Sequence, residues 1–107
     1  MKIVWLFMQG ENTLCTLIKA DYTKHLVEIQ NYTNIVEYCA FGIKENPTWA
    51  DYEIFISDRV FPPTRAEMKR TLRSYDLDFY DPLMIIEKTD GRMAEDSQWL
   101  IRVDESK

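Results

Sequence analysis

The sequence predicts a single α+β domain over residues 1–107: an antiparallel β-meander of about four strands, three helices and a closing C-terminal strand. Turn signals recur at intervals of about ten residues up to Gly42, as in a meander. After Asn46-Pro47 the apolar residues follow a helical period instead. Strands segregated from helices in this way are typical of the α+β class. A chain of 107 residues with 46% hydrophobic content has the size and composition of one domain around one core.

The strands are predicted from bulky apolar runs separated by turns. Residues 2–8 and 13–19 flank a Gln9–Asn12 turn and predict a hairpin. Residues 25–30 alternate and predict a third strand, and residues 35–41 predict a fourth that ends at Gly42. The apolar run at residues 98–103 predicts the closing strand, which should return to the sheet because a lone apolar strand is not stable in water.

Each predicted helix begins at a capping signal. Thr48 with Asp51 forms a capping box, and Thr64 with Glu67 predicts a second one after the Pro62-Pro63 break. The third helix should begin at Asp81-Pro82 and end at Asp90-Gly91. The apolar face of the first helix consists of Trp49, Tyr52, Phe55, Ile56 and Val60. The second helix should turn Met68, Leu72 and Tyr75 inward.

The charges are unevenly distributed along a chain whose net charge is -5. Residues 58–73 carry five Lys or Arg against two acids, whereas residues 74–96 carry seven acids against two cations. Either the two segments neutralise each other across a tertiary contact, or they form patches of opposite sign for a polar partner. Non-specific binding to nucleic acid is disfavoured, because phosphate contacts need a net basic surface.

The two cysteines, Cys15 and Cys39, lie within apolar runs and are expected to be buried reduced thiols. The apolar run near the N-terminus is too short for a signal peptide or a membrane helix. We therefore expect a cytoplasmic protein.

No catalytic constellation stands out in the sequence. His25 is the sole histidine, and it has no nucleophile or acid at a recognised spacing, so a surface role is expected. One His and two separated Cys do not supply a zinc site. Gly10, Gly42 and Gly91 each sit at the end of a predicted element, which turn chemistry alone requires. We expect neither a cofactor nor an enzyme.

The region around the Phe61-Pro62-Pro63 corner is the strongest candidate for a partner-binding surface. Arginine and aromatic residues dominate interface hot spots, and proline lowers the ordering cost of binding. Phe61, with Tyr75, Phe79 or Tyr80, would form the aromatic centre. The predicted contact residues are Arg59, Phe61, Pro62, Arg65, Lys69 and Arg73. The alternative is a solvated helix face whose cations pair with nearby acids.

The segment from Asp90 to Trp99 is a second candidate, because it combines acids with Arg92 and an aromatic residue. Asp90, Glu95 and Asp96 would surround a divalent metal in a small enzyme, although their spacing fits no calcium-loop template. An internal ion pair from Arg92 to Glu95 or Asp96 is the favoured interpretation.

The run Asp58-Arg59-Val60-Phe61-Pro62 resembles the D-N-L-L-P run of the N-terminal subdomain of HipA-type Ser/Thr kinases, the toxins of bacterial toxin–antitoxin systems. The preceding layout, a short antiparallel sheet followed by an aromatic helix, is similar over residues 1–75. The residues from Phe55 to Trp99 also resemble small bacterial proteins encoded near such kinases. The resemblance implies a stand-alone subdomain that docks on a HipA-type kinase and neutralises it. The alternatives are an acidic inhibitor that mimics nucleic acid, or the metal-dependent enzyme.

Overall fold

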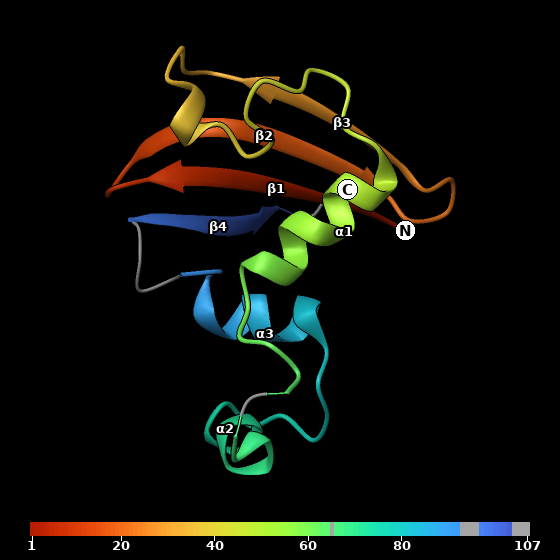
Figure 1. The fold of residues 1–107 in the computed structure, drawn as a ribbon, viewed down its shortest axis with the longest axis vertical. Helices are drawn as coiled ribbons and strands as arrows, with labels where there is room; N and C mark the ends of the chain where they lie inside the picture. Colours follow the sequence, from red (N-terminus) through yellow and green to blue (C-terminus); the bar gives the residue numbers. More distant parts are fainter. Residues whose placement is uncertain (65, 93–96, 104–107) are drawn as a thin grey trace.

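The computed structural model describes residues 1–64, 66–92 and 97–103, which form an α+β domain with one four-stranded antiparallel sheet (Figure 1). The elements in chain order are β1 (Lys2–Gln9), β2 (Thr13–Asp21), β3 (Leu26–Asn31), the 3₁₀ helix η1 (Val36–Tyr38), α1 (Trp49–Asp58), α2 (Met68–Ser74), α3 (Pro82–Thr89) and β4 (Gln98–Val103). The strand order is β3-β2-β1-β4. The predicted fold class is confirmed, including the closing strand, which pairs with β1.

The predicted hairpin is formed by β1 and β2, with Trp5 opposite Ile18. Gly10, in the connecting turn, has φ +65, a left-handed conformation that glycine adopts without steric cost. A β-bulge shifts the register between Phe7 and Met8. β4 then adds to the free edge of β1, so the central strand is built from residues near the start of the chain and its neighbour from residues near the end.

The prediction of a fourth meander strand at residues 35–41 is wrong. The segment forms η1 and turns. It folds over the sheet because the sheet offers it two side-chain partners: Ala40 N donates to Thr16 Oγ1 at 3.1 Å, and Gln98 Nε2 donates to Tyr38 O at 3.0 Å. The meander therefore has three strands, and the fourth strand of the sheet is β4.

The first and third predicted helix starts are confirmed. At α1, Thr48 Oγ1 accepts a hydrogen bond from Asp51 N, and Asp51 Oδ2 accepts one from Thr48 N. At α3, Asp81 Oδ1 accepts from Leu83 N, and the helix ends at Asp90, whose φ is 58. These caps satisfy backbone N–H groups that have no partner within the helix.

The predicted capping box of Thr64 and Glu67 is wrong, because α2 begins only at Met68. Glu67 has φ 57, so its backbone is left-handed and cannot be the third residue of a helix that starts at Thr64. The Glu67 side chain, at the N-cap position of α2, makes no capping hydrogen bond. Residues 63–64 and 66–67 form turns after the two prolines, which shortens the helix to seven residues.

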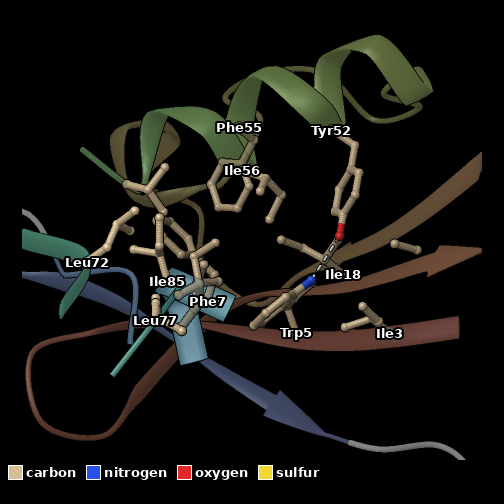
Figure 2. Packing of buried hydrophobic residues seen from close by; sticks show 14 residues of the cluster. Ile3, Trp5, Phe7, Ile18, Tyr52, Phe55, Ile56, Leu72, Leu77 and Ile85 are labelled. Atoms are coloured by element: carbon tan, nitrogen blue, oxygen red, sulfur yellow. Dashed lines mark hydrogen bonds between the residues drawn. The ribbon is translucent and has the colours of Figure 1, made fainter. Parts of the chain in front are cut away.

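The core fills the space between one face of the sheet and the helices (Figure 2). Ile3, Trp5 and Phe7 alternate along β1 and point towards α1. Their partners from the other elements are Ile18, Ala20, Tyr52, Phe55, Ile56, Val60, Leu72, Leu77, Ile85, Ile86 and Leu100. Trp5 is fully buried, and its Nε1 donates to Tyr52 Oη at 3.0 Å. The hydrogen bond lets two amphipathic rings occupy an otherwise apolar interior.

Candidate functional site

The predicted binding region forms a segment that projects from the body of the domain. We call the described residues 61–64 and 66–80 the arm; Arg65 lies outside the described residues. Figure 1 shows α2 below α3, at the end of the molecule away from the sheet. Leu72 and Leu77 are buried and join the arm to the core. The N–H of Leu77 donates back to Leu72 O at 2.9 Å, so the chain turns sharply after α2.

An aromatic cluster fixes the base of the arm. The Phe61 ring stacks on Tyr75, with centroids 6.3 Å apart, and meets the edge of Tyr80 at 6.0 Å. Tyr80 Oη donates to Phe61 O at 2.7 Å, and partial burial raises the pKa of Tyr80. Phe61 is half-buried by these contacts. The predicted hot-spot residue therefore holds the arm together.

The exposed surface of the arm combines proline, cationic and aromatic side chains. Pro62, Lys69 and Arg73 are exposed, in agreement with their predicted place on a surface. Phe79 is 58% exposed and is the most exposed large apolar side chain of the described part of the arm. Lys69 and Arg73 border an open hollow of about 200 Å³ whose other lining residues are Leu72, Leu77 and Asp78.

The hypothesis of internal neutralisation can be compared with the ion pairs of the described residues. They include Lys44–Asp51, Arg70–Glu67 and Arg102–Glu87. Arg70 pairs with Glu67 within the arm at 3.4 Å, and both side chains of this pair are exposed. Across residues 1–64, 66–92 and 97–103, no ion pair joins Lys69 or Arg73 to an acid of the following segment. Both side chains are exposed, so their charged groups face solvent.

The predicted place of Arg59 in the partner-binding surface is wrong for the folded chain, because Arg59 is 7% exposed. Its Nε donates to Gly91 O at 2.9 Å and its Nη2 donates to Gln98 O at 2.7 Å. The guanidinium also lies over the Phe7 ring, 5.4 Å from the centroid. Arg59 thus links the end of α1 to the outer edge of β4.

One feature of the sequence indicates that Arg59 is buried. Arg59 follows Phe55 and Ile56 by four and three positions, so it continues the buried face of α1. Arg59 is the C-cap of α1 and its N–H still donates to Ile56 O, so its side chain leaves the helix on this face. The carbonyl groups that it binds belong to the α3–β4 connection and to β4, and no local pattern places these beside α1.

The acidic segment of residues 90–99 is only partly described, since Glu95 and Asp96 lie outside the described residues. Asp90 ends α3 in a left-handed conformation, and the Arg92 guanidinium lies 4.7 Å from the Trp99 ring centroid. Within the described ranges, no group of three His, Cys, Asp or Glu side chains is arranged to hold a metal ion. The ion pair predicted for Arg92 falls on residues that are not described.

His25 and the cysteines make structural contacts. His25 is exposed and stacks on Trp49, with ring centroids 5.1 Å apart. Both cysteines are free thiols. Cys15 is buried as expected, and burial raises its pKa, whereas Cys39 is partly exposed. A raised thiol pKa opposes formation of the nucleophilic thiolate.

A hydrogen-bonded aromatic network between β2 and α1 was not predicted. The Tyr22 and Tyr52 hydroxyl oxygens are 2.7 Å apart, and Tyr52 also accepts from Trp5. Burial is the largest cause that raises the pKa of both tyrosines, so both phenols stay protonated at neutral pH. The network supports packing between α1 and the sheet and supplies no general base.

The apolar face of the sheet opposite the helices was also not predicted from the sequence. Strand alternation places Val4, Leu6 and Met8 on it, opposite Val103, Ile101 and Trp99 of β4. Leu17 extends it onto β2 beside Leu6. These residues do not belong to the core cluster or to the side chains packed against it. Among the described residues, the helices and the loop after β3 contribute their buried side chains to the other face.

Comparison with known proteins gives no matching family model, no matching curated protein and no matching solved structure. In the part of the chain that the structure describes, every helix is too short or too polar to span a bilayer.

Proposed function

We propose that this chain is a non-catalytic protein-binding module and that the arm is its contact surface. The observation that carries the proposal is the exposed Phe79 ring on a projecting segment that also presents Lys69 and Arg73. Aromatic and cationic side chains together account for most interface hot spots. The Phe61 cluster orders the base of the arm before binding, which lowers the entropic cost of association.

The partner class that we propose is a HipA-type kinase, which the chain would neutralise as an antitoxin-like protein in the cytoplasm. The support is the resemblance around Asp58 to Pro62 and the order of elements that precedes it, a small antiparallel sheet followed by α1.

The test is a pull-down of the tagged full chain from its native host, followed by calorimetric titration of the purified chain into the recovered kinase. Phe79→Ala and the charge reversal Lys69→Glu/Arg73→Glu should each raise Kd at least roughly 30-fold, the equivalent of about 2 kcal/mol. Ile54→Ala is the matched control, since Ile54 is a comparably exposed apolar residue on α1. Phe61→Ala is a poorer test because it disturbs the arm itself.

A kinase that loses activity at one equivalent of this chain would support the antitoxin-like function. Unchanged Kd in both arm variants would refute the contact surface. Recovery of a nucleic-acid enzyme instead of a kinase would refute the partner class and favour the acidic-mimic alternative, whose binding should weaken steeply with salt.

A further inference from the structure

The sheet has two edge strands, β3 and β4, and their outer edges differ. An edge strand with unpaired N–H and C=O groups is a template for pairing with another chain. On β4, Arg59 Nη2 donates to Gln98 O, and Leu100 N donates to Asp90 O at 2.7 Å. The residue that caps the end of α1 and the residue that ends α3 therefore occupy backbone groups of this edge. The outer edge of β4 is partly protected from a further strand.

The outer edge of β3 carries backbone groups without such partners. Tyr32, which follows β3, donates its N–H to Cys15 O on β2 at 2.8 Å. In an antiparallel pair, residues that bond to the neighbouring strand alternate with residues whose N–H and C=O point away from it. Counted back from Tyr32, three residues of β3 point these groups outward: Val27, Ile29 and Asn31. In the described part of the chain, no hydrogen bond reaches these outward groups.

The strand β3 is accessible along its whole length. None of its six residues is buried. Leu26 at its start is 59% exposed, and Tyr32 just beyond its end is 51% exposed. Proline, lysine and β-bulges are common devices that block pairing at an edge, and β3 contains none of them. Glu28 is its one charged residue, so the position of Glu28 limits which strand can pair there.

The backbone pattern of β3 matches a second copy of β3 in one antiparallel register. A two-fold axis places each residue opposite the residue that lies equally far on the other side of the axis. With Ile29 on the axis, Val27 lies opposite Asn31 of the second copy, and every outward N–H and C=O of β3 finds a partner. With Glu28 on the axis, two carboxylates would be directly opposed, which is destabilising, and Asn31 would have no partner within β3.

The side chains fit the same register. Leu26 lies opposite Tyr32 of the second copy at both ends of the contact, so the two exposed apolar side chains cover each other. An aromatic ring opposite an apolar side chain stabilises a strand pair. Glu28 lies opposite Gln30 of the second copy, whose side-chain amide can donate a hydrogen bond to the carboxylate.

We propose that this chain associates with a second copy of itself by antiparallel pairing of β3 with β3, with Ile29 on the two-fold axis. The pairing joins two four-stranded sheets into one continuous sheet. The contact is one strand wide, so its area is below that of a standard stable interface, and Kd should be on the order of 10–100 µM. This inference goes beyond the proposed function, and Figure 1 shows β3 at the end of the molecule opposite α2.

Sedimentation velocity of the purified full chain over a wide range of concentrations measures the association. Gln30→Glu places a carboxylate opposite Glu28 of the second copy and should raise Kd about fivefold or more, whereas Gln30→Lys should lower it. Asn12→Glu is the matched control, because it adds the same charge in the exposed turn after β1, and Kd should stay within about twofold of the unaltered value. Gln30 is exposed, so its variants should keep the fold.

Hydrogen exchange at low and high protein concentration locates the contact. The amides of Val27, Ile29 and Asn31 point outward, so they should exchange more slowly in the dimer than in the monomer. The amides of Glu28 and Gln30 already bond to β2 and should change little. Protection that alternates along β3 is expected from edge pairing and from no other contact of this strand.

A chain that stays monomeric at millimolar concentration would overturn the inference. A dimer that Gln30→Glu leaves as tight as the unaltered chain would also overturn it, and so would protection that does not alternate along β3. Phe79→Ala on the arm should leave the Kd of the dimer unchanged, and Gln30→Glu should leave the affinity for the partner of the arm unchanged. A failure of the proposed function and a failure of this inference therefore give different results.

Discussion

Replacement of Arg59 by methionine should lower the free energy of unfolding far more than replacement of any exposed cation in the described part of the chain. Methionine keeps the length and apolar stem of the side chain but removes the donors to Gly91 O and Gln98 O, at 2.9 and 2.7 Å. Both carbonyl groups would be left without this partner in a region where Arg59 itself is 7% exposed. The cation–π contact with Phe7 would also be lost.

The expected magnitude follows from the two hydrogen bonds. A hydrogen bond with a charged donor contributes about 1.5–3 kcal/mol, and an acceptor left buried and unpaired costs about as much as the bond contributed. Two such bonds give a loss of about 3–6 kcal/mol, a large part of the free energy of about 5–15 kcal/mol that stabilises a domain of this size. The corresponding fall in Tm is on the order of 20 °C.

Urea denaturation followed by tryptophan fluorescence measures the loss, because Trp5 is fully buried in the core. Arg59→Lys should recover only part of the stability, since an ammonium does not reproduce the two donors of the guanidinium fork. Arg73→Met is the control: Arg73 is exposed, and its replacement should change stability by less than about 0.5 kcal/mol. A loss below about 1 kcal/mol for Arg59→Met would refute the structural role and return Arg59 to the list of interface residues.

Two further substitutions test the packing around β4 and α1. Gly91→Ala should cost about 1–3 kcal/mol, because φ is +61 and the new Cβ would lie 3.0 Å from Leu100 Cδ1; Gly10→Ala, with a similar φ and open space around it, should cost less in the same urea titration. We expect alkaline destabilisation of the domain in thermal melts above about pH 10, and Tyr22→Phe should reduce it. The raised pKa of Tyr22 means that the folded state retains its proton while the unfolded state loses it, so that contribution is present below the unfolded pKa and is lost as pH rises. An unchanged slope in the variant would contradict this assignment.

The fold was predictable wherever a local pattern has one structural solution. The capping box of Thr48 and Asp51 and the Asp81-Pro82 start are satisfied by residues within one turn, so the sequence contains both partners. Residues 35–41 alternate like a strand, but the donors and acceptors that determine their path are Thr16 and Gln98, which are remote in sequence. The periodic pattern of a segment contains no information about partners that are remote in sequence.

The candidate site was likewise predictable where local patterns determine it and not where contacts remote in sequence do. Exposure of Pro62, Lys69 and Arg73 followed from helix periodicity and from the proline break. The burial of Arg59 depends on carbonyl groups of residues 91 and 98, and the burial of Phe61 depends on Tyr75 and Tyr80 folding back around the arm. The apolar sheet face opposite the helices could be recognised only from the strand order, because the pairing of β4 with β1 brings Ile101 beside Leu6.

The arm should open locally before the rest of the domain unfolds. The described contacts that hold it are the two buried leucines, Leu72 and Leu77, and the aromatic cluster at Phe61, whereas β1 is hydrogen-bonded on both sides. Regions with few buried apolar contacts exchange their amide hydrogens through local opening at a lower free energy than the core. In hydrogen exchange of the free protein, α2 amides should therefore exchange at least tenfold faster than those of β1.

Binding should reverse this difference if the arm is the contact surface, because a partner that binds only the ordered arm stabilises it by mass action. Slowed exchange in α2 with unchanged exchange in β1 would place the partner on the arm. Slowed exchange confined to β1, β2 and β4 would instead place the partner on the sheet face opposite the helices. Amides of α2 that exchange as slowly as those of β1 in the free chain would refute the idea of a locally weak arm.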